Sequence, residues 1–229
     1  MRNFSIYEQL GIVIPGAAFL FGILFYAPEL RDVLGKDGIN IGGLGLFLLV
    51  AFSAGHLLAA LGNLIESLYW RARGGMPTNW IIGPTPRLLS RPQVLNIETK
   101  VNKRLGLSVP ALSACDAAMW FSISRQIYTD VERHGRTARV KAFNGNYGLN
   151  RGLCAAMLAL AIVSVVIDRQ RWFIGLGLLI LSAIYLYRMQ RFGVHYAREL
   201  YNQFLSLPDN ITAPKKSGRA PRMAVQQRA

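Results

Sequence analysis

The chain has 229 residues, of which 52% are hydrophobic, and its mean hydropathy is +0.27. It is too apolar for an ordinary soluble domain of this length. The net charge of +14 would suit a nucleic-acid-binding protein, but no nucleic-acid-binding motif accompanies it. The apolar residues instead form charge-free blocks, which favours a membrane protein and argues against a nucleic-acid partner.

Two of these blocks predict a first transmembrane hairpin over residues 1–70. Residues 9–28 and 38–65 carry no charged side chain, and each block is long enough to cross the ~30 Å hydrocarbon core of a bilayer. Residues 29–39, which contain several charges, would form the connecting loop outside the cell.

Residues 71–148 are predicted to form a basic cytoplasmic helical segment, with twelve Lys and Arg against four Asp and Glu. Apolar periodicity and a glycine stop signal place helices at about 93–105 and 111–132. A further helix would begin at about 136–143 and be broken or bent by the sequence NGNYG at 144–148.

A second transmembrane hairpin is predicted at residues 149–187. Its two charge-free blocks flank the short charged stretch 168–171, which would form a tight turn at the far membrane interface. Residues 188–207 would then continue as a cytoplasmic amphipathic helix. Residues 208–229 have the composition of a disordered basic tail.

The distribution of basic residues predicts the orientation. Lys and Arg are concentrated in the central segment and after the fourth apolar block, and such residues stay on the cytoplasmic side. The predicted fold is all-α: a polytopic membrane protein with four transmembrane helices and a small helical cytoplasmic layer. We expect it in the inner (plasma) membrane, multi-pass, with both termini cytoplasmic and no disulfide between Cys115 and Cys154.

Polar residues interrupt the second apolar block. His56, Asn63 and Glu66 fall within roughly 80° of one another on a helix surface. An ionisable residue inside a membrane segment is a functional-site hypothesis by default. His56, the intramembrane member, is expected to hydrogen-bond across helices. The predicted topology puts candidate partners at the depth of Glu66, namely Tyr147, Asn150 and Arg151.

The last predicted helix presents a basic face with Arg191, His195 and Arg198. Guanidinium groups bind phosphate, and imidazole transfers protons near neutral pH. The duller alternatives are that this face rests on anionic lipid and that Glu66 only pairs with an arginine. Arg188 and His195 also resemble in spacing the Arg–His pair of HEPN ribonucleases, which adds RNase activity as a minor alternative.

Together these residues predict one polar pocket for an anionic ligand at the inner leaflet. Glu66 and His195 would be catalytic only if the protein is an enzyme. No metal site and no cofactor are predicted, since no metal or nucleotide motif is present. The predicted ligand-binding residues are Asn63, Tyr147, Asn150, Arg151, Arg191 and Arg198.

The functional prediction is an inner-membrane protein that senses or acts on the membrane, as a homo-oligomer. The expected partners are the lipid bilayer and its anionic headgroups, with a cytoplasmic protein or nucleotide as a further ligand. One version is a defence or stress effector that permeabilises the membrane. The alternatives are a membrane-embedded hydrolase or transferase acting on a phosphate-bearing lipid or nucleotide, and a small transporter.

Overall fold

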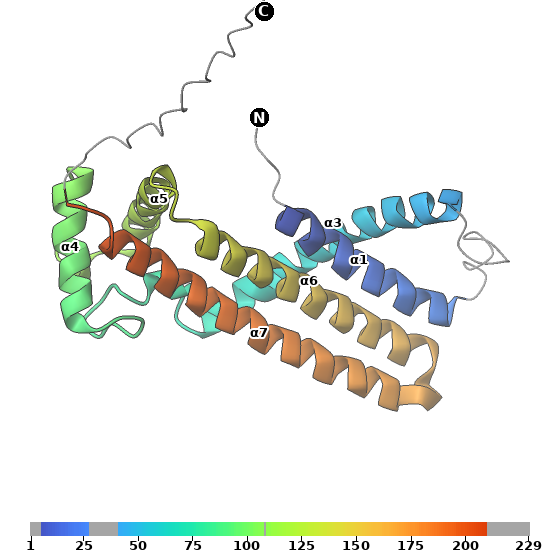
Figure 1. The fold of residues 1–229 in the computed structure, drawn as a ribbon. Helices are drawn as coiled ribbons and strands as arrows, with labels where there is room; N and C mark the ends of the chain where they lie inside the picture. The colour runs from blue at the N-terminus through green and yellow to red at the C-terminus, as the bar shows by residue number, and fades with distance from the viewer. Residues whose placement is uncertain (1–5, 28–40, 108, 210–229) are drawn as a thin grey trace, which may run out of the picture.

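A computed structural model describes residues 6–27, 41–107 and 109–209 of the chain (Figure 1). These residues contain no β-strand. The loop predicted at 29–39 and nearly all of the basic tail predicted at 208–229 lie outside the described residues. The α-helices are α1 (Ile6–Tyr26), α3 (Ile41–Ala72), α4 (Arg91–Leu105), α5 (Ala117–Arg133), α6 (Ala138–Ile167) and α7 (Trp172–Leu205).

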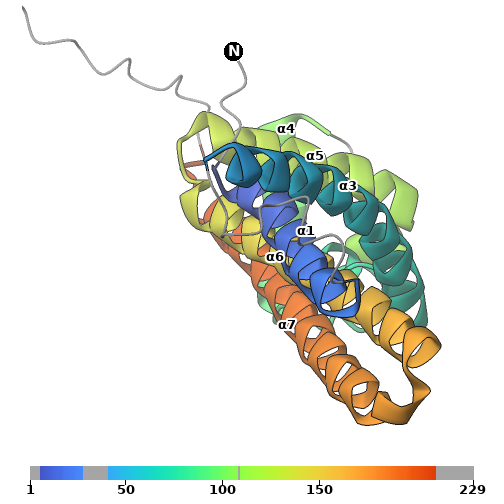
Figure 2. The ribbon, with the colours of Figure 1, turned by 90° about the vertical axis from the view of Figure 1, so that its right-hand side faces the viewer.

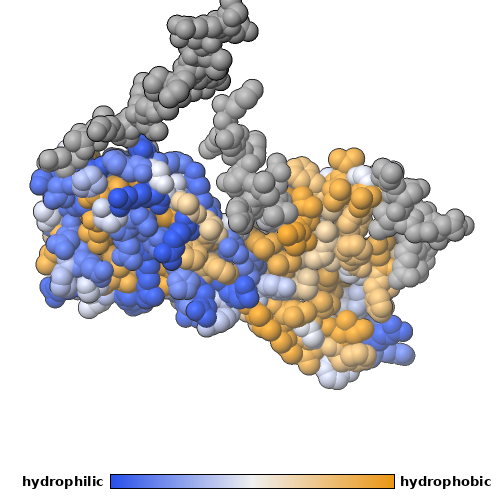
Figure 3. Space-filling view, viewed as in Figure 1, coloured by the Kyte–Doolittle hydropathy of each residue, from blue (hydrophilic) through white to orange (hydrophobic). Residues whose placement is uncertain are grey.

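Three of these helices, α3, α6 and α7, are long and apolar enough to cross a membrane. Helix α1 has 21 residues and contributes a shorter apolar stretch, Gly11–Tyr26. Figure 3 shows the consequence for the surface, which is hydrophobic over one end of the molecule and hydrophilic over the end that carries α4 and α5. The apolar end, formed by α1, α3 and parts of α6 and α7, is called the bundle below.

Small residues allow the bundle helices to pack closely. A Cβ atom placed on Gly16 of α1 would lie 1.8 Å from the backbone oxygen of Ala51 in α3. One on Gly55 of α3 would lie 2.1 Å from the oxygen of Ile12. Backbone contact of this kind is typical of helix pairs in membranes. Helix α1 therefore lies directly against α3, and it also packs against α6.

Helix α7 packs along α6, on the opposite side of the bundle from α3 (Figures 1 and 2). A hydrogen bond joins α6 and α7 within the apolar part, where Ser182 Oγ donates to the Cys154 carbonyl over 3.0 Å. Near the far end, Tyr26 of α1 donates to Ser164 Oγ of α6 over 2.8 Å. These bonds satisfy polar groups that lipid could not satisfy.

The opposite end, called the head, contains α4, α5, the 3-10 helices Pro77–Asn79 and Leu112–Ala114, and the last turns of α7. Its core is made of large buried side chains, among them Ile97, Trp120 and Phe204. Trp120 Nε1 and the Tyr201 hydroxyl both donate to the Thr78 carbonyl, over 2.8 and 2.7 Å. The chain entering from α3 is thereby tied to α5 and α7.

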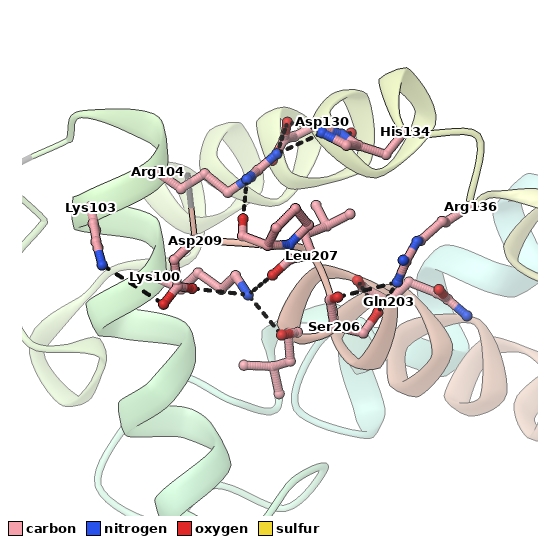
Figure 4. A network of polar contacts seen from close by, with 12 residues as sticks. Lys100, Lys103, Arg104, Asp130, His134, Arg136, Gln203, Ser206, Leu207 and Asp209 are labelled. Atoms are coloured by element: carbon pink, nitrogen blue, oxygen red, sulfur yellow. Dashed lines mark hydrogen bonds and ion pairs between the residues drawn. The ribbon is translucent and has the colours of Figure 1, made fainter. Parts of the chain in front are cut away.

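Two buried cations of α4 bind the carboxyl end of α7 (Figure 4). Lys100 Nζ donates to the carbonyls of Leu205, over 2.7 Å, and Leu207. Arg104 donates to the Pro208 carbonyl and to the Asp130 carboxylate of α5. The last carbonyls of a helix have no partner within the helix and carry partial negative charge. Lys100 supplies a donor and a positive charge to the last carbonyl of α7, at Leu205, and both cations bind carbonyls of the residues that follow the helix.

The predicted head helices are present with adjusted ends. Helix α4 begins at a capping box in which the Gln93 side chain accepts from Ser90 N over 3.0 Å. Helix α5 begins later than predicted, because Asp116 caps it by accepting from Met119 N over 2.7 Å. Its predicted glycine stop is confirmed, since Gly135 has a φ of +70°.

The predicted break at 144–148 is wrong, because α6 continues through it without interruption. Asn146 donates to the Ala142 carbonyl over 2.9 Å, and Asn150 donates to the Asn146 carbonyl over 2.7 Å. These asparagines bond the preceding turn and do not cap a new helix. Helix α7 runs without interruption from the last span through residue 188, so the predicted continuation of this helix is confirmed. Helices α6 and α7 thus run from the bundle into the head.

Candidate functional site

A groove of about 810 Å³ lies between the bundle and the head. Helices α1, α3, α5, α6 and α7 all contribute to its wall. Gly11, Ile12 and Ala59 line it on the bundle side, and Arg125, Thr129 and Asn144 line it on the head side. The groove therefore joins an apolar region to a polar one.

An ion pair between the bundle helices forms part of the groove wall. Arg151 Nη1 of α6 donates to Glu66 Oε2 of α3, and the two side chains are 24% and 17% exposed. Gly62 makes room for this arginine, because a Cβ there would lie 3.1 Å from Arg151 Cγ. Arg151 Nε is buried and has no hydrogen-bond partner among the described residues. The guanidinium thus retains a donor that its carboxylate partner does not use.

An aromatic layer supports this ion pair from the head side. Tyr147, one turn before Arg151, lines the groove and accepts a hydrogen bond from Trp70 Nε1 over 2.7 Å. Gly193 of α7 brings the helices together here, since a Cβ on it would lie 3.1 Å from both aromatic rings. Nearby, the Tyr69 hydroxyl donates to Gln190 Oε1 over 2.5 Å. These contacts fix the end of α3 against α6 and α7.

The head side of the groove carries two further cations. Arg125 of α5 is exposed, and its guanidinium lies 5.7 Å from the Phe121 ring. Lys141 of α6 pairs with Glu132 of α5 over 2.7 Å. With Arg151 and Glu66, the lining has three cations and two carboxylates. The groove can therefore accommodate one anionic group with its charge balanced.

The structure brings together three of the residues singled out from the sequence, Glu66, Tyr147 and Arg151. Asn150 is buried beside the groove wall and accepts a hydrogen bond from Arg188 Nε over 3.2 Å. Asn63 and His56 do not line the groove and are exposed on the outer face of α3.

The basic face predicted on the last helix does not reach the groove. Arg191 and Arg198 are exposed on α7 and are not among the lining residues. The His195 ring stacks on Phe143, with centroids 5.5 Å apart. The lining residues of α7 come from a different face and include Tyr196 and Leu200.

Sequence reasoning missed the contribution of α5. Arg125, Tyr128, Thr129 and Glu132 line the groove, and their i, i+3, i+4, i+7 spacing puts them on one stripe of the helix. That stripe was visible in the sequence as the polar side of an amphipathic helix. Its position over the start of α6 depends on the packing of the head, which no local pattern encodes.

The groove offers hydrogen-bond donors and charge but no metal site, because the described residues contain no group of His, Cys, Asp and Glu suited to a metal ion. No protein-family model, curated protein or solved structure matches the chain. The class of protein is therefore defined by the fold alone: a helical protein with three helices long and apolar enough to span a membrane.

Proposed function

We propose that this is a multi-pass inner-membrane protein that senses the membrane by binding an anionic amphiphile, a lipid with one anionic headgroup, in the groove. The observation that carries the proposal is that the groove lining changes from apolar residues on the bundle side to charged residues toward the head. Residues such as Ile12 and Ala59 would receive an acyl chain, and Arg125, Lys141 and Arg151 would surround the headgroup. The groove lining has one more cation than it has carboxylates, which favours a ligand with a single negative charge.

The unused donor of Arg151 supports this ligand. A buried N–H without a partner is costly, and a phosphate or carboxylate oxygen would satisfy it with a charge-assisted hydrogen bond. Binding beside α5 would link the headgroup to the head. Because the groove wall includes both bundle and head helices, occupancy would stabilise one arrangement of the two regions.

We further propose four membrane spans with both termini cytoplasmic. Helix α1 supports the fourth span, because it packs by backbone contact between Gly16 and Ala51 in the same apolar region as α3. The distribution of Lys and Arg supports the orientation. In intact cells, a membrane-impermeant thiol reagent should label Lys36→Cys and Gln170→Cys but not the exposed Thr85→Cys. Labelling of Thr85→Cys, or protection of Lys36→Cys, would contradict this topology.

Lipid binding tests the main proposal. In native mass spectrometry of the detergent-solubilised protein, phosphatidylglycerol should bind more tightly than phosphatidylcholine. Arg125→Gln should weaken phosphatidylglycerol binding about tenfold, the value of one charge-assisted hydrogen bond. The matched control is Arg198→Gln, an exposed arginine on α7 outside the groove. Equal affinity of Arg125→Gln and wild type, or an equal loss for Arg198→Gln, would refute the groove as the binding site.

The enzymatic alternative is less well supported. Its two candidate catalytic residues are separated in this arrangement, because Glu66 pairs with Arg151 while His195 stacks on Phe143 outside the groove. The permeabilising effector and the transporter draw no support from the groove. Turnover of phosphatidylglycerol by the wild-type protein, abolished in Glu66→Gln, would restore the hydrolase or transferase proposal.

A further inference from the structure

The outer face of α3 carries exposed polar side chains within the apolar bundle. The inner face, with Ala51, Gly55 and Leu58, is buried against neighbouring helices. The opposite face has no neighbour among the described elements, and its side chains are exposed. A face directed outward from a bundle should be uniformly apolar if only lipid covers it.

This face is instead polar at several positions. Ser53, His56, Asn63 and Ser67 are all exposed on it. The His56 ring packs edge-on against Phe52, with centroids 4.6 Å apart. Within the part of the chain that the structure describes, the side chains of His56 and Asn63 have no hydrogen-bond partner. In a hydrocarbon environment such groups are costly unless another molecule satisfies them.

The exposed positions follow a heptad repeat. Intervals of three and four residues alternate without a break along the face, and every member is exposed. This is the spacing at which two helices pack in a left-handed coiled coil, the commonest crossing in membranes. It extends over ~32 Å by helical rise, about the thickness of the hydrocarbon core. The members of this α3 seam are Leu46, Leu49, Ser53, His56, Ala60, Asn63 and Ser67.

The chemistry of the seam favours a second copy of the same chain. Two parallel helices related by a twofold axis along the membrane normal place each residue opposite itself. An asparagine amide and a neutral imidazole each contain a donor and an acceptor, so Asn63 can pair with Asn63 and His56 with His56. No charged residue lies on the seam to oppose this pairing. Ser53, Ala60 and Ser67 are small enough for close backbone approach.

We infer that the protein forms a homodimer in the membrane through the α3 seam, with His56 and Asn63 hydrogen-bonding to their counterparts in the second copy. The inference is independent of the groove. The seam and the groove lie on different faces of α3, since Glu66 and Ala59 line the groove and neither belongs to the seam. Failure of lipid binding would leave the dimer intact, and loss of the dimer would leave the groove intact.

Disulfide crosslinking in native membranes tests the geometry. Ala60→Cys should form a disulfide-linked dimer under mild oxidation. Leu57→Cys is the matched control, because Leu57 is 75% exposed on the same helix at nearly the same depth but lies off the seam. The wild-type chain, whose two cysteines are buried, gives the background. Equal crosslinking of the two variants, or crosslinking of Ala60→Cys only to another protein, would overturn the inference.

A second measurement tests the polar contacts. The double variant His56→Leu/Asn63→Leu should weaken dimerisation in liposomes about tenfold, measured by fluorescence energy transfer over a range of protein-to-lipid ratios. Because leucine suits a lipid-facing position, the variant should keep the wild-type circular dichroism. The control Leu57→Ala/Leu64→Ala should dimerise as the wild type does. A wild-type protein that stays monomeric at all ratios, or a double variant with unchanged affinity, would overturn the inference.

Discussion

The head and the bundle are held together by different means, although α6 and α7 run through both. The head buries large side chains such as Trp120, Ile127 and Phe204. The bundle leaves large apolar side chains exposed and packs its helices through glycine and alanine backbones. In water, burial of apolar area is the dominant favourable force. In lipid that force is absent between helices, so close packing and hydrogen bonds replace it.

Polar groups show the same contrast. The head neutralises its buried cations in one network, in which Arg104 contacts Asp130, His134 and the Pro208 carbonyl (Figure 4). Because the guanidinium donates to His134 Nε2, that nitrogen must accept, and Nδ1 carries the proton that it donates to the Asp130 carbonyl over 2.8 Å. Among the described residues of the bundle, polar contacts between helices are neutral apart from the Glu66–Arg151 pair at the groove and the hydrogen bond from Arg188 to Asn150.

The largest expected effect comes from filling the closest backbone contact of the bundle. In Gly16→Val, the Cβ atom would overlap the Ala51 backbone, which cannot move aside as a flexible side chain could. We expect loss of the folded protein, measured as the yield of monodisperse material after extraction in mild detergent. Gly177→Val is the control, since a Cβ there meets nothing within 4 Å. A normal yield of Gly16→Val would mean that α1 does not pack at this distance.

Next comes the buried cation network of the head. Arg104→Ala should lower the free energy of unfolding by about 3–5 kcal/mol, because the largely buried Asp130 would lose its arginine partner. Lys103→Ala, at an exposed neighbouring position, should change it by less than about 0.5 kcal/mol. The measurement is denaturant unfolding followed by tryptophan fluorescence. Equal effects of the two substitutions would contradict a structural role for the network.

Removing a buried leucine of the head should cost more than removing an exposed leucine of the bundle. Leu200→Ala removes a leucine that is 1% exposed and should cost about 2–5 kcal/mol through lost burial and a residual cavity. Leu176→Ala, in the bundle part of the same helix, removes a side chain that is 47% exposed. It should have little effect on the thermal unfolding midpoint of the protein in nanodiscs. A comparable shift for both variants would remove the distinction between the two regions.

A smaller effect is expected from the hydrogen bond between α6 and α7. Ser182→Ala deletes the donor to the Cys154 carbonyl, and hydrogen bonds between membrane helices average about 0.6 kcal/mol. Thermal unfolding in nanodiscs should show a destabilisation of that order. A loss as large as that of Leu200→Ala would show that polar contacts dominate the bundle.

The smallest effect concerns a thiol of the head. Burial, together with the neighbouring Asp116 carboxylate, raises the pKa of Cys115 above that of a free thiol. The thiolate, which is the reactive form, is therefore scarcer in the folded protein at any given pH. In a Cys154→Ala background, the alkylation rate of Cys115 should rise with pH, and the midpoint of this rise should lie at a higher pH than that of a small free thiol. A midpoint at or below that of the free thiol would contradict this environment.

The sequence alone determined the class of structure. Charge-free blocks, glycine and proline placement and apolar periodicity predicted an all-helical membrane protein, the helices near 93–105 and 111–132, and the glycine stop at Gly135. These features are local, because hydropathy and backbone preference act within one or two turns of the chain. Local signals failed at 144–148, where the asparagines satisfy themselves along a continuous helix.

Only the tertiary structure decided which polar residues meet. The sequence grouped His56, Asn63 and Glu66 on one helix surface, yet α3 directs Glu66 toward Arg151 and leaves the other two outward. Arg191 and His195 shared a predicted depth with the groove, but the rotation of α7 keeps them from it. The depth of a residue in the membrane follows from the hydropathy of the chain around it, which can be read from the sequence. The rotation of each helix follows from backbone contact at positions such as Gly16, Gly55 and Gly193, which depends on several helices at once.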